Sequence, residues 1–134
     1  MFFSSSQTFP NNNTVFILRS RPPQIDYAAL LSEVDRHTSS ETDVFANGAN
    51  VSSAVFHAIQ SARGPGGCNW VGFYFCRSLL APSPPEKQVL LLGPFQGKPA
   101  CRRIAFEEGV CGKAATTRTA QLVPDVHKFP GHIA

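Results

Sequence analysis

The cysteines are the residues best suited to chemistry in this 134-residue chain. Cys101 follows a Gly-Lys-Pro-Ala segment, and Cys111 lies in Gly-Val-Cys-Gly, where a helix is predicted to begin. A thiolate near a helix N-terminus is stabilised by backbone N–H groups and by the helix dipole, and neighbouring basic side chains act in the same direction. We therefore expect both thiols to have lowered pKa values and to act as nucleophiles or redox centres. The spacing leaves one alternative open, in which both are small side chains packed in a core.

The remaining candidates for thiol or metal chemistry carry weaker signals. Cys68 lies in a Gly-rich turn and Cys76 ends a predicted strand, so both are expected to be ordinary thiols. No two cysteines form a CxxC pair, which argues against a zinc site. His127 and His132, five residues apart with Asp125 nearby, are only a weak metal pattern. We therefore predict no metal site.

Two aromatic residues are candidates for ligand binding. Trp70 and Tyr74 are four positions apart in a predicted strand, so they share one of its faces. Such a pair can enclose the methyl group of a small ligand. The alternative is that both rings pack in the core against helices.

The elements that would position these side chains follow from the apolar periodicity. Apolar residues at helical spacing over 27–34 predict an amphipathic helix with Asp26 as its N-cap. A second apolar stripe over 51–62 predicts another helix, with Asn50 as its cap and the glycines of 64–67 as its end.

The second half of the chain has the character of a sheet. Strands are predicted over 69–76, 89–92, 103–106 and 120–123, with a Pro-rich loop over 78–88 and a short helix over 109–117. Gly93-Pro94 is expected to end the second strand, and Pro124 the fourth. This order predicts an α+β fold, with an antiparallel sheet flanked by helices that pack on one face.

Composition and charge exclude several classes of function. The chain is 43% hydrophobic with a net charge of +3, and its basic residues are scattered, so no nucleic-acid partner is expected. No apolar run reaches the length of a membrane span, so no membrane association is expected. Residues 1–24 contain no acidic residue and are expected to form a flexible N-terminal tail. A mitochondrial presequence and a wrongly chosen start are the alternatives for this segment.

Four sequence blocks resemble one enzyme family. The segments 69–74, 92–101, 109–114 and 126–134, in this order, are similar to the free methionine-R-sulfoxide reductases, and the resemblance runs from about Gln24 to Ala134. It implies a GAF domain over residues 25–134. It also implies a cytoplasmic enzyme that reduces free methionine-(R)-sulfoxide and not the protein-bound form. Many members of the family are dimers, so a homodimer is one open assembly state.

The resemblance also implies roles for individual residues. Cys101 and Cys111 match two of the three cysteines of the family. Trp70 and Tyr74 would line the substrate pocket, with Trp70 against the substrate methyl group, and Ile133 and Ala134 would belong to the same pocket. A thiolate attacks the sulfoxide sulfur, the resulting sulfenic acid condenses with a second cysteine, and thioredoxin reduces the disulfide. Thioredoxin is an external reductant, and no bound cofactor is implied.

The chain departs from the family pattern at its end. In the family the Gly-His-Ile-Ala segment is followed at once by the third cysteine, whereas this sequence stops at Ala134. That third cysteine is usually the nucleophile with the Cys101 position as its resolving partner, although members differ. The acidic residues that hold the substrate ammonium, the last strand and the last helix also lie further on. We therefore expect an incomplete domain with a marginal fold and little reductase activity. A non-catalytic GAF module that binds a small molecule and an inactive gene-model fragment are the alternatives.

Overall fold

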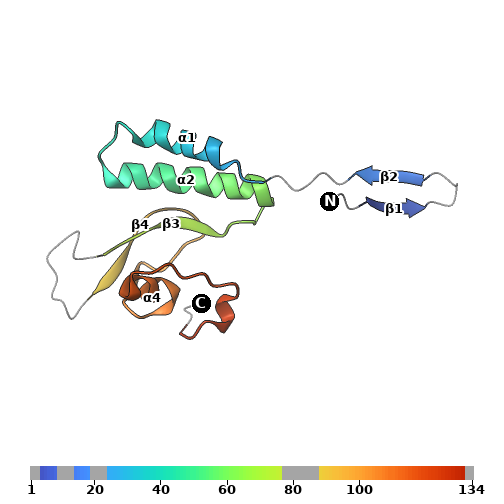
Figure 1. Ribbon diagram of the computed structural model, residues 1–134. Helices are drawn as coiled ribbons and strands as arrows, with labels where there is room; N and C mark the ends of the chain where they lie inside the picture. The colour runs from blue at the N-terminus through green and yellow to red at the C-terminus, as the bar shows by residue number, and fades with distance from the viewer. Residues whose placement is uncertain (1–3, 9–13, 19–23, 77–87, 132–134) are drawn as a thin grey trace.

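The computed structural model describes residues 4–8, 14–18, 24–76 and 88–131 (Figure 1). Its elements in chain order are β1 (Ser4–Thr8), β2 (Thr14–Leu18), α1 (Tyr27–Thr38), α2 (Val44–Arg63), β3 (Trp70–Cys76), β4 (Val89–Gly97), β5 (Arg103–Ala105), α4 (Gly109–Thr117) and the 3-10 helix η1 (Val126–Lys128). From α1 to α4 this is the predicted order, and the fold is α+β as expected.

The sheet and the helices are arranged in layers. Strands β3, β4 and β5 form an antiparallel sheet in that order, α2 packs on β3 and β4, and α1 packs on α2. Figure 1 shows α4 on the opposite side of the sheet from α1 and α2. The prediction that the helices share one face is therefore wrong for α4. The connection between β5 and α4 is short, so it holds the helix against the strand that it follows.

The cap predicted for α1 is confirmed, but its buried face is narrower than predicted. The Asp26 side chain accepts a hydrogen bond of 3.0 Å from the Ala29 N–H. Leu30 is half-buried and lines a cleft between α1 and α2, whereas Tyr27 is 67% exposed and Leu31 is 68% exposed. One helix packed on a single neighbour buries only the residues that face it, which explains the narrower stripe.

Helix α2 begins seven residues earlier than predicted. Its N-cap is Asp43, whose side chain accepts a hydrogen bond of 2.8 Å from the Ala46 N–H, so the prediction of Asn50 as the cap is wrong. Gly48 lies inside the helix because it packs closely on β4, where a Cβ at this position would be 3.1 Å from Pro94 Cγ. This tertiary contact outweighs the low helix propensity of glycine. The predicted glycine end is confirmed, since Gly64 caps the helix with φ of 85°.

Strand β4 continues through Gly93-Pro94, which were expected to end it. The register of β3 against β4 shifts between Gly72 and Tyr74, so the sheet contains a bulge at this point. A bulge accommodates a proline, which has no N–H to donate to the ladder. Gly93 is required because a Cβ there would lie 2.5 Å from the ring of Phe75.

Apolar side chains are buried on both faces of the sheet. Leu90 and Ile104 are paired across β4 and β5, share the face of Tyr74, and are each 7% exposed. The opposite face packs on α2. The fully buried Ser52 hydroxyl lies 2.7 Å from the Gly48 carbonyl oxygen and 3.3 Å from that of Pro94, so it links α2 to β4.

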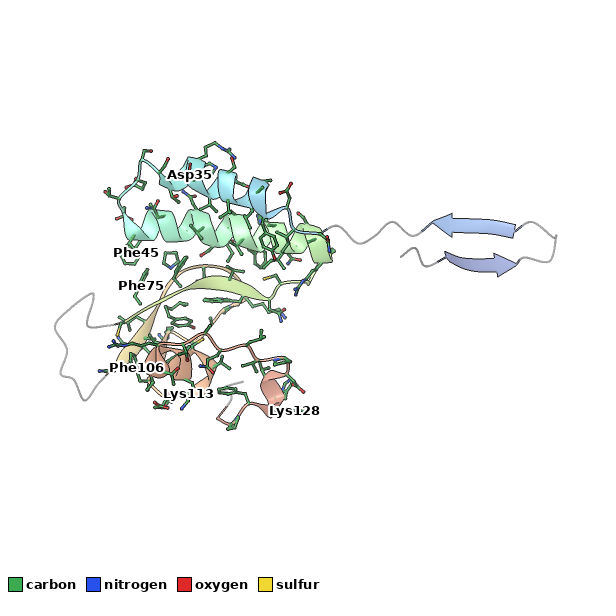
Figure 2. The ribbon with its side chains drawn as sticks, in the orientation of Figure 1. Asp35, Phe45, Phe75, Phe106, Lys113 and Lys128 are labelled. Atoms are coloured by element: carbon green, nitrogen blue, oxygen red, sulfur yellow. The ribbon has the colours of Figure 1, made fainter. Side chains whose placement is uncertain are left out.

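One face of β3 belongs to this core. Figure 2 shows Phe45 of α2 beside Phe75 of β3, and their rings meet edge to face with centroids 5.5 Å apart. Phe73 stacks beside Phe75 on the same face. The face of β3 that carries Trp70 and Tyr74 is therefore the one turned away from α2.

One strand predicted from the sequence is absent from the structure. Residues 120–123 form no strand, and Leu122 is 95% exposed. A strand needs a hydrogen-bonding neighbour, and no strand in the described ranges pairs with this segment. Within residues 1–24, β1 and β2 pair as an antiparallel ladder.

The structure also bears on membrane association. In the described part of the chain, no helix has both the length and the apolar character needed to cross a membrane.

Candidate active site

The structure brings Cys101 and Cys111 together at one cavity of about 250 Å³. Cys101 lies in the connection from β4 to β5, and Cys111 lies in the first turn of α4. The other lining residues are Ile104, Glu108, Gly109, Val110 and Val126. Two thiols separated by nine residues of sequence therefore meet at a small cavity with a mainly apolar wall.

The environment of Cys111 raises the pKa of its thiol above the ordinary value. Partial burial of the thiol, which keeps some exposure to solvent, is the main cause, and the negative charge that Cys101 would carry as a thiolate adds to it. The predicted lowering of this pKa is therefore wrong. The helix N-terminus is outweighed by desolvation, and the nearby Lys113 is 3.3 Å from the carboxylate of Glu107, which offsets its charge.

Tyr74 connects the sheet to the cysteine cavity. Its hydroxyl donates a hydrogen bond of 2.8 Å to the backbone carbonyl oxygen of Cys101. Burial raises the pKa of Tyr74, and the neighbouring Cys101 and Cys111 raise it further. The hydroxyl therefore remains a donor at neutral pH.

Trp70 lies in an aromatic stack on the same face of the sheet. Its ring centroid is 5.6 Å from that of Tyr74 and 6.0 Å from that of Phe95. The indole N–H is buried and has no hydrogen-bond partner among the described residues. A buried donor of this kind is suited to an acceptor atom of a ligand.

The remaining sequence candidates lie away from this cavity or outside the described residues. The Cys68 thiol is 3.6 Å from the Trp70 carbonyl oxygen, and Cys76 ends β3, so neither lines the cavity. Asp125 caps η1 by accepting from the His127 N–H. The described ranges contain no group of three or more residues able to hold a metal ion. His132, Ile133 and Ala134 lie outside the described residues.

Sequence reasoning missed one charged residue of the cavity. Glu108 is the N-cap residue of α4, its side chain makes no capping hydrogen bond, and it lines the cavity with both thiols. Its position directly before Gly-Val-Cys was the available signal, because the residue before a helix start lies beside the first turn.

Comparison with solved structures identifies proteins that resemble this chain in both fold and sequence. A structure described as that of the GAF domain is 41% identical in sequence, with a TM-score of 0.67. The match covers 80% of this chain and 56% of the chain in that structure. The Neisseria meningitidis free methionine-R-sulfoxide reductase, solved in complex with its substrate, is 36% identical with a TM-score of 0.64 and the same two coverages. The chain is homologous to the free methionine-R-sulfoxide reductases and has the GAF fold.

The curated proteins agree with this assignment. The free methionine-R-sulfoxide reductase of Saccharomyces cerevisiae is 43% identical over 105 residues, which are 78% of this chain and 54% of the yeast protein. The chain spans between 54% and 59% of the length of the curated relatives that it matches. No family model matches the sequence. The match therefore covers about four fifths of this chain and a little more than half of the yeast protein.

Proposed function

We propose that the protein reduces free methionine-(R)-sulfoxide to methionine, with Cys101 and Cys111 as its redox-active thiols. The observation that carries this proposal is the shared cavity of the two thiols, which Tyr74 connects to the aromatic stack. Homology to proteins named for this reaction supports it.

The proposed reaction has three steps. A thiol sulfur attacks the sulfoxide sulfur, the oxygen is transferred to the cysteine as a sulfenic acid, and methionine leaves. The second thiol attacks the sulfenic sulfur, so a disulfide forms and water leaves with the transferred oxygen. A dithiol protein such as thioredoxin then reduces the disulfide and is itself oxidised. This recycling needs a reducing compartment, so we place the reaction in the cytoplasm.

The two thiols have different parts in this scheme. Because the attacking group is the thiolate, the raised pKa of Cys111 makes this residue a poor first nucleophile at neutral pH. Within the pair we therefore assign the resolving step to Cys111.

The aromatic stack provides the substrate contacts. The face of Trp70 supplies an apolar surface for the methyl group, and its buried N–H supplies a donor for the sulfoxide oxygen. Ile104, Val110 and Val126 form an apolar wall that suits a thioether chain.

The test is oxidation of NADPH coupled through thioredoxin reductase and thioredoxin, with free methionine-(R)-sulfoxide as substrate. The 134-residue protein is compared with a chimera that continues into the corresponding C-terminal segment of the yeast relative. We expect activity that requires Cys101 in at least the chimera, and no activity towards the (S) epimer. A Cys68→Ser variant is the matched control, because Cys68 does not line the cavity. Inactivity of both proteins would contradict the proposal and favour a non-catalytic small-molecule-binding module.

A further inference from the structure

The connection that carries Cys101 is held by the sheet at both of its ends. The Lys98 N–H donates to the Asn69 carbonyl oxygen at 3.0 Å, and the Arg102 carbonyl oxygen accepts from the Leu92 N–H at 3.1 Å. Between these anchors, the hydrogen bond from the Tyr74 hydroxyl is the only one that residues 99–101 make with the described part of the chain. The backbone position of Cys101 thus depends on a side chain 27 residues away.

We propose that Tyr74 is a positioning residue, whose hydroxyl holds Cys101 at the distance from Cys111 that disulfide formation requires. The inference rests on the redox pair of the proposed function. A disulfide forms only when the two Cα atoms lie about 4.4–6.8 Å apart, so a small shift of the connection changes how readily the bond closes. Tyr74 is well placed for this role because its strand is fixed by pairing with β4, where Tyr74 lies opposite Leu92.

The same geometry limits what Tyr74 can do for a substrate. A hydroxyl has one proton to donate, and in Tyr74 that proton is used by the Cys101 carbonyl oxygen. The ring is not involved in that bond, and its centroid lies 5.6 Å from that of Trp70. Tyr74 therefore offers a substrate its apolar surface, while its hydroxyl acts on the cysteine connection.

The experiment uses Tyr74→Phe, which removes one oxygen atom and keeps the ring. The 134-residue protein and the variant are equilibrated in glutathione redox buffers, quenched by alkylation, and mapped by mass spectrometry for the Cys101–Cys111 disulfide. We expect the equilibrium constant for forming this disulfide to fall about fivefold, the effect of losing one ordinary hydrogen bond.

The matched control is Ser52→Ala, which removes a buried hydroxyl between α2 and β4, on the other side of the sheet from α4. It should lower the melting temperature and leave the disulfide equilibrium unchanged. An unchanged equilibrium in Tyr74→Phe would overturn the proposal, as would an equal fall in Ser52→Ala, because the effect would then be general destabilisation. Absence of the disulfide in the unmodified protein would overturn it too. Failure of the proposed function has a different signature, which is a disulfide that forms normally without any sulfoxide-dependent NADPH oxidation.

Discussion

Gly72→Ala is expected to disrupt the sheet beneath the aromatic stack. Gly72 lies opposite Phe95 at the bulge between β3 and β4. A Cβ at position 72 would lie 2.3 Å from the Cβ of Phe95 and 2.8 Å from the Pro94 carbonyl oxygen. Opposed Cβ atoms in a sheet are normally about 4.5–5.5 Å apart, so the two strands must separate by more than about 1 Å.

The cost follows from this displacement. Overpacking of a well-packed site costs about 1–3 kcal/mol, and strained ladder hydrogen bonds next to the bulge add about 1 kcal/mol each. We therefore expect Gly72→Ala to lower the free energy of unfolding by about 3 kcal/mol, a large part of the about 5–15 kcal/mol typical of a domain. For a chain of this size, that loss corresponds to about 10 °C in melting temperature.

The assay is urea unfolding followed by far-ultraviolet circular dichroism, with Gly48→Ala as the matched control. At Gly48 the added Cβ would be 3.1 Å from Pro94 Cγ, and the gain of about 1 kcal/mol in helix propensity offsets this contact. The control is expected to stay within about 1 kcal/mol of the unmodified protein. A midpoint for Gly72→Ala equal to that of the unmodified protein, at unchanged m value, would refute the close approach at the bulge.

Three further predictions follow from the caps and charges. Asp43→Ala should lower the free energy of unfolding by about 1 kcal/mol in thermal melts, whereas Asn50→Ala should cost less than about 0.5 kcal/mol, since Asp43 is the observed cap. Alkylation of Cys111 should rise with pH to a midpoint above the ordinary thiol value of 9.0, and Cys101→Ser should move that midpoint down without removing the contribution of burial. Because this pKa is raised in the folded state, its stabilising effect is present below pH 9.0 and is lost as the pH rises through the folded-state value, which pH-dependent melts can follow. Lys113→Ala should change the unfolding free energy by less than about 0.5 kcal/mol, because the ion pair with Glu107 is exposed.

Local patterns were sufficient to predict much of the fold. The capping side chain of Asp26 and the apolar periodicity behind it predict α1 from its first residue, and the residues of α4 are those predicted. Where tertiary contacts decide, the same reasoning failed. The low helix propensity of glycine makes Gly48 argue against a helix at this point. In the fold, however, Gly48 is the residue that allows α2 to approach β4. The continuation of β4 through Pro94 likewise depends on a bulge that involves its partner strand.

The proximity of candidate side chains was easier to predict than their electrostatics. Even spacing places Trp70 and Tyr74 on one face, and in the structure their ring centroids lie 5.6 Å apart in a tilted arrangement. The pKa of Cys111 could not be predicted, because the apolar wall is built from residues distant in sequence, such as Ile104 and Val126. The hydrogen bond from Tyr74 to Cys101 was missed for the same reason, since it joins a strand to a connection that no local pattern places beside it.

The aromatic stack has a practical consequence for measurement. Trp70 is the only tryptophan of the chain, and its ring contacts those of Tyr74 and Phe95 with its indole nitrogen shielded from solvent. Its intrinsic fluorescence is therefore an internal reporter of the proposed substrate pocket. An acceptor that reaches the indole N–H, or a shift of Tyr74, will change the emission directly. Methionine and its sulfoxides can thus be titrated against the unlabelled protein, and occupancy of the pocket can be followed separately from turnover.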